Sequence, residues 1–229
     1  TSHTLSGLNT GTTYYTAISA YDGDGNESWV STDTSATPQS VPTTLAFSTQ
    51  PSGVTAGSSF GAQPVVVVND LEGNTVTSAT DSVTVSITSD TGAAGASLVG
   101  TATVSAINGV ATFTDLLIEK AGTGYTLTAS SGSLTSAVSS SFDVSAATAS
   151  TLVVVSEPST TAAGEAFGTQ PVVQIQDAYG NVITSSAVSV TASITADTGT
   201  PGGTLSGSTT LSASSGVATF SGLSIDKAG

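Results

Sequence analysis

The chain lacks cysteine and methionine, and it has almost no positive charge. Its 229 residues include two lysines, no arginine and one histidine, and the formal net charge is −14. Phosphate groups are bound mainly by Lys and Arg, so this charge excludes nucleic acid and anionic membrane surfaces as partners. Without cysteine there is no disulfide or thiol chemistry, so each domain must be held together by its hydrophobic core alone.

Other features that enzymes and membrane proteins need are missing too. No run of 18 apolar residues exists, so we expect no membrane insertion. The sequence opens inside a domain rather than on a signal peptide, so any signal is expected upstream. The lone His3 makes neither a metal site nor a catalytic triad. The glycine-rich segments 92–95 and 199–203 precede no helix that would bind phosphate. We therefore expect no catalysis and no cofactor.

A long internal repeat is present instead. Residues 44–122 align without a gap with residues 151–229, a separation of 107 residues, and about half of the paired positions are identical. FGAQPVVVVNDLEGN in the first copy becomes FGTQPVVQIQDAYGN in the second. A period of this length predicts tandem copies of a whole domain rather than a solenoid of small units.

Alternating apolar and polar residues predict strands along most of the chain. Gly73-Asn74, Asn108-Gly109 and other turn signals separate them. This spacing predicts an all-β fold of tandem immunoglobulin-like β-sandwiches. The strands expected in the complete copy are Leu45–Thr49, Pro64–Asn69, Ser82–Ser89, Ser97–Ser105, Val110–Leu116, Tyr125–Ala129 and Ala137–Val144. The core residues expected there are Phe60, Val66, Ile87, Leu98, Phe113, Tyr125 and Leu127.

Residues 1–37 do not fit the repeat. The segment from Leu8 to Tyr14, LNTGTTY, resembles the L-x-P-G-T-x-Y corner of fibronectin type III domains, with Thr10 in place of the proline. The resemblance implies that the Tyr14 hydroxyl bonds back to the backbone. It also implies that Tyr14, Thr16, Ile18 and Ala20 face a core, and that residues 29–37 form a closing strand.

The repeated unit resembles bacterial Ig-like domains of the intimin and invasin type. The residues that carry the resemblance are VVND-x-x-GN at 67–74, NGVATF at 108–113 and AG-x-GY-x-L at 121–127. It implies an extracellular location at the bacterial cell surface and a structural or adhesive role. The alternative is an accessory spacer or carbohydrate-binding module of a secreted polysaccharide-degrading enzyme.

The expected organisation has three parts. Residues 1–37 are the C-terminal strands of a fibronectin type III-like domain, and residues 38–147 are a complete bacterial Ig-like domain. Residues 148–229 are a second Ig-like repeat that lacks its last two strands. Both copies are expected to share one backbone and one strand register, because the alignment needs no insertion.

One loop has the spacing of a calcium site. Asp22, Asp24 and Asn26 place oxygen atoms at alternate positions, as calcium loops do, so they are candidate metal ligands. However, Glu27 stands where such a loop needs glycine, and an ordinary hairpin loop explains the same residues. We therefore expect weak or no calcium binding here. The segments Asp70-x-x-Gly73-Asn74 and Asp177-x-x-Gly180-Asn181, which recur at equivalent places in the two copies, are interpreted as turns.

The two ends raise the question of partners. An open sandwich exposes an apolar face and unpaired strand edges. We expect Tyr14, Ile18 and Tyr21 at one end to need a cover, as well as Phe220, Leu223 and Ile225 at the other. The cover is either other copies of the chain, in a head-to-tail filament built by strand complementation, or further sequence of the same long protein.

Overall fold

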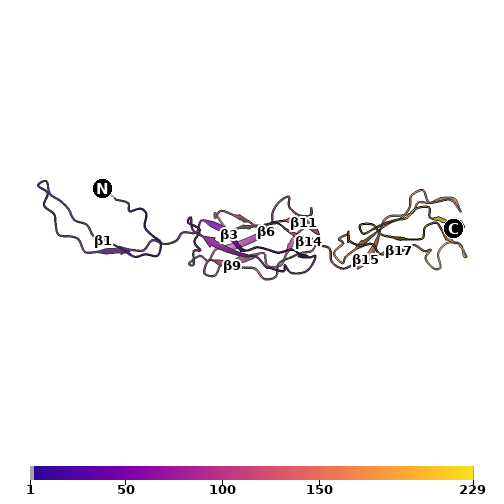
Figure 1. Ribbon diagram of the computed structural model, residues 1–229, viewed down its shortest axis with the longest axis horizontal. Helices are drawn as coiled ribbons and strands as arrows, with labels where there is room; N and C mark the ends of the chain where they lie inside the picture. Colours follow the sequence, from indigo (N-terminus) through magenta and orange to yellow (C-terminus); the bar gives the residue numbers. More distant parts are fainter. Residues whose placement is uncertain (1–2, 229) are drawn as a thin grey trace.

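The chain is all-β, as the sequence predicts. The computed structural model describes residues 3–228, and its regular elements are all strands. Three units follow one another along the longest axis (Figure 1). No helix in the described part of the chain is long and apolar enough to cross a membrane.

Residues 3–37 form one long hairpin. β1 (Tyr14–Thr16) pairs with β2 (Thr34–Ala36) in antiparallel fashion. The Tyr14 hydroxyl accepts a hydrogen bond from the backbone N–H of Asn9 at 2.8 Å, which confirms the predicted corner. The expectation that Thr16, Ile18 and Ala20 face a core is wrong for this structure, because no second sheet formed by residues 3–228 lies opposite the hairpin. All three are exposed, and the exposed fraction of Ile18 is 75%.

The first repeat is a complete sandwich. Its first sheet has the order β3-β5-β9 and its second the order β13-β12-β6-β8. A third sheet, β11-β14-β4, and the pair β10-β7 close one end. The bounds are β3 (Thr44–Thr49), β4 (Val54–Thr55), β5 (Val65–Asn69), β6 (Ser82–Ile87), β7 (Leu98–Val99), β8 (Thr103–Ser105), β9 (Val110–Thr112), β10 (Leu117–Ile118), β11 (Gly122–Tyr125), β12 (Leu127–Ser130), β13 (Ala137–Val138) and β14 (Phe142–Ser145).

The core lies between the two main sheets. Successive side chains of a strand point to opposite faces, so alternate residues of each strand are buried. Val66 and Val68 of β5 therefore meet Val83 and Val85 of β6 in one apolar cluster. Of the predicted core residues, Phe60, Val66, Phe113, Tyr125 and Leu127 are buried, and Ile87 and Leu98 pack at the edge of the cluster.

Three predicted strands are wrong in their bounds because the chain changes partners within them. The expected strand Tyr125–Ala129 is split between β11, which pairs with β14, and β12, which pairs with β6. The expected strand Ser97–Ser105 is split at Gly100, whose φ is +109°, into β7, which pairs with β10, and β8, which pairs with β6. The expected strand Ala137–Val144 is split into β13, on β12, and β14, on β11. The short strand β4, parallel to β14, was not predicted.

The second repeat keeps the register of the first. β15 (Thr151–Ser156) pairs with β16 (Val172–Gln176) as β3 pairs with β5, including the irregularity before the last pair. The other strands are β17 (Ser189–Thr191), β18 (Leu205–Ser206), β19 (Thr210–Ser212), β20 (Val217–Thr219) and β21 (Ser224–Ile225). Each of their pairs matches a pair of the first repeat shifted by 107 residues. The prediction of one shared backbone and register is confirmed.

Phe220 and Leu223 do not need a cover from outside. Both are buried in the core of their own repeat, so the expectation that they lie on an open face is wrong. Ile225 is half-buried, whereas Tyr21 and Ile18 at the other end are exposed. Other large apolar residues of the second repeat are exposed instead, among them Leu152, Val154 and Val188.

Candidate functional site: the joint between the repeats

Three hairpin turns of the chain share one sequence pattern, Asp-x-x-Gly-Asn. They are Asp22–Asn26, Asp70–Asn74 and Asp177–Asn181. In each turn the Asp N–H donates to the Asn carbonyl, at 3.0, 2.9 and 3.0 Å respectively. The Gly N–H donates to the Asp carbonyl, at 3.1, 3.1 and 3.2 Å. Each glycine has a φ of 80–86°, a left-handed conformation that side chains disfavour. The three turns are therefore one structural device.

The aspartate side chain holds each turn in place. Its Oδ1 accepts hydrogen bonds from the backbone N–H groups two and four residues later, at 2.8–3.1 Å in all three turns. An Asp that bonds its own local backbone in this way stabilises a turn without help from the rest of the protein. The sequence carries the signal for all three turns, and the turn at Asp22 is the one whose oxygen spacing also suggests a metal loop.

The calcium candidates lie in the first of these turns. Both carboxylate oxygens of Asp22 accept hydrogen bonds, from the backbone N–H groups of Asp24 and Asn26 and from the side-chain amide of Asn26. That amide and the backbone donors lower the pKa of Asp22. Among the described residues, no three acidic or histidine side chains gather into a potential metal site. Weak or absent calcium binding at this turn stays a prediction.

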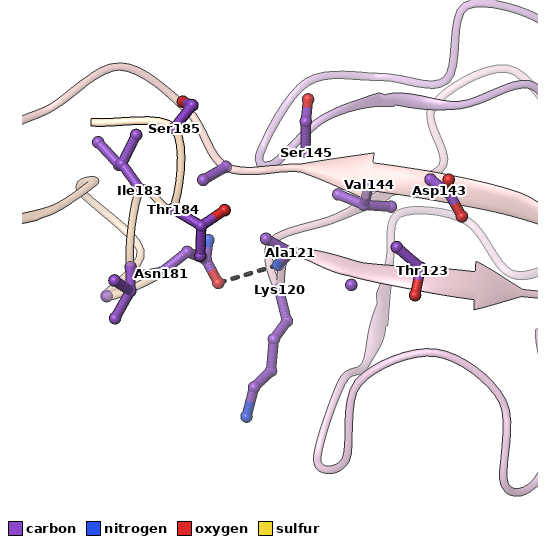
Figure 2. A pocket seen from close by; sticks show the side chains of 14 residues that line it. Lys120, Ala121, Thr123, Asp143, Val144, Ser145, Asn181, Ile183, Thr184 and Ser185 are labelled. Atoms are coloured by element: carbon purple, nitrogen blue, oxygen red, sulfur yellow. Dashed lines mark hydrogen bonds between the residues drawn. The ribbon is translucent and has the colours of Figure 1, made fainter. Parts of the chain in front are cut away.

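The third turn lies at the joint between the two repeats. The Asn181 side-chain oxygen accepts a hydrogen bond from the backbone N–H of Ala121 at 2.9 Å, and its amide donates to the Glu119 carbonyl at 2.8 Å. Figure 2 shows the first of these bonds crossing from the second repeat to the first. Asn181 is buried, with 8% of its surface exposed. One amide side chain therefore satisfies two backbone groups of the neighbouring repeat.

Tyr179, at the tip of the same turn, lies against Gly57 of the first repeat. A Cβ atom on Gly57 would lie 2.0 Å from the Tyr179 ring and hydroxyl, so a larger residue there would displace this partly exposed side chain. Gly57 also has a φ of +74°, which favours glycine independently. The turn therefore contacts the first repeat in two ways. The Tyr179 ring lies against Gly57, and the Asn181 amide bonds backbone groups of the first repeat.

Asp177 ties the turn to the linker. Its Oδ2 accepts a hydrogen bond from the backbone N–H of Ala147 at 2.8 Å and another from the Asn181 amide at 2.9 Å. Burial acts to raise the pKa of Asp177, but the hydrogen bonds from Asn181, Ala147 and Tyr179 outweigh it, so the net effect is a lowered pKa. The carboxylate is thus charged at neutral pH and holds the linker against the turn.

A groove of about 650 Å³ runs beside this joint (Figure 2). It is lined by residues 120–123 and 143–146 of the first repeat and its linker, and by residues 180–185 of the second. Among these side chains, Lys120 and Asp143 are the two of acidic or basic type. General acid–base or nucleophilic catalysis needs a positioned acid, base or nucleophile with partners that activate it. The described residues of the groove offer no such set, and the side chain of Asn181 in its lining makes hydrogen bonds that cross the joint.

The joint in front of the first repeat is built differently. The turn Asp70–Asn74 faces the segment Gly7–Gly11 across a hollow that also involves Ser40. The Asn74 side chain is exposed, and its recorded hydrogen bond goes to Asp70 of its own turn, at 3.5 Å. Position 72, which corresponds to Tyr179, is a glutamate. The same turn therefore makes a buried joint in one place and a solvated one in the other.

Comparisons with known proteins give neither a family nor a curated relative. No family model matches the chain, and no curated protein matches it. Domains 4–9 of the surface layer protein SbsC align with 97% of this chain and 38% of theirs, at 17% identity and a TM-score of 0.33. The Escherichia coli adhesin FdeC aligns with 86% of this chain and 60% of its own, at 21% identity and a TM-score of 0.39.

A glycosyl hydrolase family 2 member from Bacteroides cellulosilyticus aligns with 54% of this chain and 16% of its own, at 15% identity and a TM-score of 0.33. The chain thus spans between 16% and 60% of the lengths of these three structures. All three TM-scores are below 0.5.

Proposed function

We propose that this chain is a non-catalytic structural segment of an extracellular bacterial surface protein. In this proposal it sets distance and direction between the parts that it connects. The observation that carries the proposal is the joint at Asn181, where one repeat is fixed to the next by buried hydrogen bonds and a fitted aromatic side chain. Rigid tandem domains hold their ends at a defined separation, whereas flexible linkers do not.

The composition supports the same role. A charge of −14 with only two lysines keeps such a segment soluble and away from anionic surfaces. The resemblance of the repeats to intimin- and invasin-type domains supports the location at the bacterial surface and an adhesive role of the parent protein. The assignment as an accessory module of a polysaccharide-degrading enzyme remains the alternative. It places the same spacer function in a different parent protein.

A measurement of the angle between the repeats tests the proposal. The chain has no cysteine, so Ser86→Cys and Ser193→Cys place two spin labels at equivalent exposed positions, one in each repeat. We expect a narrow distribution of label–label distances in the otherwise unchanged chain. Asn181→Ala removes the partner of two backbone groups, at a cost of about 1–3 kcal/mol. The distance distribution should therefore broaden in that variant.

Asn74→Ala is the matched control. It changes the same position of the same turn in the first repeat, where the side chain is exposed. We expect it to leave the distribution between the two labels unchanged. A broad distribution in the chain that carries only the two labels would overturn the proposal, because the repeats would then move independently.

A further inference from the structure

The second repeat carries the same backbone groups that receive the Asp177 turn on the first. In the first repeat these groups are the Glu119 carbonyl, the Ala121 N–H and Gly57. Shifted by 107 residues, they become the Asp226 carbonyl, the Ala228 N–H and Gly164. We call these three positions the distal socket.

The glycine of the distal socket has the same local geometry as its counterpart in the first repeat. The Gly164 N–H donates to the Ile225 carbonyl at 2.8 Å, as the Gly57 N–H donates to the Ile118 carbonyl at 3.0 Å. The φ angle of Gly164 is +82°, close to the +74° of Gly57. The loop that carries the glycine is therefore placed alike against β10 in the first repeat and β21 in the second.

The two glycines differ in what lies above them. A Cβ atom on Gly57 would meet the Tyr179 ring, whereas one on Gly164 would meet no atom of residues 3–228 within 4 Å. The surface at Gly164 is thus open at the position where, in the first repeat, the Tyr179 side chain covers Gly57.

We propose that the distal socket binds an Asp-x-Tyr-Gly-Asn turn of a further repeat of this kind. The proposal rests on the proposed function, because it extends the same joint to a second place. The tyrosine of the incoming turn would cover Gly164. Its asparagine would donate to the Asp226 carbonyl and accept from the Ala228 N–H, as Asn181 does with Glu119 and Ala121.

The residue before the glycine of the turn decides which turns fit. The other two turns of this chain have Asp24 and Glu72 at that position, where the third has Tyr179. A carboxylate offers no apolar surface to cover a glycine, and it would lose hydration on contact with backbone. The distal socket therefore selects a tyrosine turn over the two acidic turns.

The occupant is a repeat joined covalently through a linker. In the observed joint the turn also holds the linker, because Asp177 accepts a hydrogen bond from the Ala147 N–H. A linker also raises the effective concentration of the turn, typically to the millimolar range. A separate copy of the chain, binding without a covalent linker, has neither the hydrogen bond to a linker nor the raised effective concentration.

The test extends the full chain by a second copy of residues 123–229. Gly229 corresponds to Gly122, so this addition continues the repeat without a gap and supplies closing strands, a linker and a further tyrosine turn. Amide hydrogen exchange is followed at Ala228 and Ala121. We expect the Ala228 amide to exchange about tenfold or more slowly than in the original chain, as expected for a new buried hydrogen bond.

Variants in the added copy separate the turn from the added strands. Asn181→Ala in that copy alone should restore fast exchange at Ala228 and leave Ala121 protected. Asn181→Ala at the original position should do the reverse. If Ala228 exchanges equally fast with and without the added asparagine while Ala121 stays protected, the distal socket is refuted and the proposed function survives.

Two other results would count against these proposals. Fast exchange at Ala121 in the original chain would refute the rigid joint itself, and so the proposed function. Protection of Ala228 that rises with the concentration of the original chain would show a partner in trans and overturn the covalent assignment.

Discussion

The two repeats have one sequence pattern and one register, yet their cores are closed to different degrees. Leu45 of β3 is 6% exposed, whereas Leu152, its counterpart in β15, is 59% exposed. Both strands pair with their neighbours in the same way. Strand pairing alone therefore does not bury this face of the sheet.

The difference comes from the strands that follow position 122. In the first repeat the segment before β13 runs beside β3, with hydrogen bonds from the Leu45 N–H to the Thr135 carbonyl and from the Thr135 N–H to the Thr43 carbonyl. The described part of the second repeat contains no corresponding strands. The comparison teaches that β3 is closed by the last strands of the sandwich, not by its own sheet.

The far side of the core does not depend on those strands. Phe113 and its counterpart Phe220 are both buried, and so are Leu116 and Leu223. One part of the core of a repeat, around Phe113 and Phe220, is thus buried without the last strands. The other part, around Leu45, is buried only when the last strands are present.

The largest expected effect is at Tyr125, which has no described counterpart in the second repeat. Its ring is buried, stacks on Phe142 with centroids 5.9 Å apart, and occupies the space above Gly92. Tyr125→Ala should cost the first repeat about 3–5 kcal/mol of unfolding free energy, measured by urea denaturation. Amide exchange in the second repeat should stay unchanged.

Tyr125→Phe sharpens this result. It keeps the ring but removes the hydrogen bond from the hydroxyl to the Lys120 carbonyl at 2.8 Å, so it should cost only about 1 kcal/mol. Equal losses in the two variants would contradict the view that ring packing completes the core.

The pair Leu45→Ala and Leu152→Ala tests the comparison at equivalent positions. Leu45 is buried, so its removal should cost about 2–4 kcal/mol. Leu152 is largely exposed, so the same change should cost less than about 0.5 kcal/mol. Calorimetry of both variants against the original chain measures the two losses. Similar losses would mean that the second repeat is closed in solution.

The smallest expected effect is the loosening of the joint at Asp177 when the pH is lowered. The pKa of Asp177 is lowered in the folded chain from its ordinary value of 3.8. Its contribution to stability is therefore present above that ordinary value, and it is lost as the pH falls through the lowered pKa. The distance distribution between labels at positions 86 and 193 should broaden in that acid range.

Asp177→Asn is the control, because it cannot titrate. In this variant the width of the label–label distance distribution should be the same at neutral and acid pH. An acid response that persists in Asp177→Asn would assign the effect to another carboxylate, such as Asp70 in the first repeat, whose pKa is lowered as well.

Much of the fold could be predicted because it depends on local pattern. Alternation placed β5 and β6, and the gapless repeat predicted the shared register. The errors lie where the chain changes partners, at Gly100, between β11 and β12, and between β13 and β14. The alternation of apolar and polar residues shows which way side chains point, but not which strand lies alongside. A change of partner strand therefore does not alter the alternating pattern.

The candidate site divides in the same way. The sequence by itself determined the three Asp-x-x-Gly-Asn turns, because each aspartate bonds backbone groups only two and four residues away. Only the tertiary structure decided that Asn181 is buried in a joint while Asn74 is solvated. The reason is that the partners of Asn181 are backbone groups 60 and 62 residues earlier, and backbone groups are the same for every residue type. A contact of this kind becomes visible only once the fold brings the two repeats together.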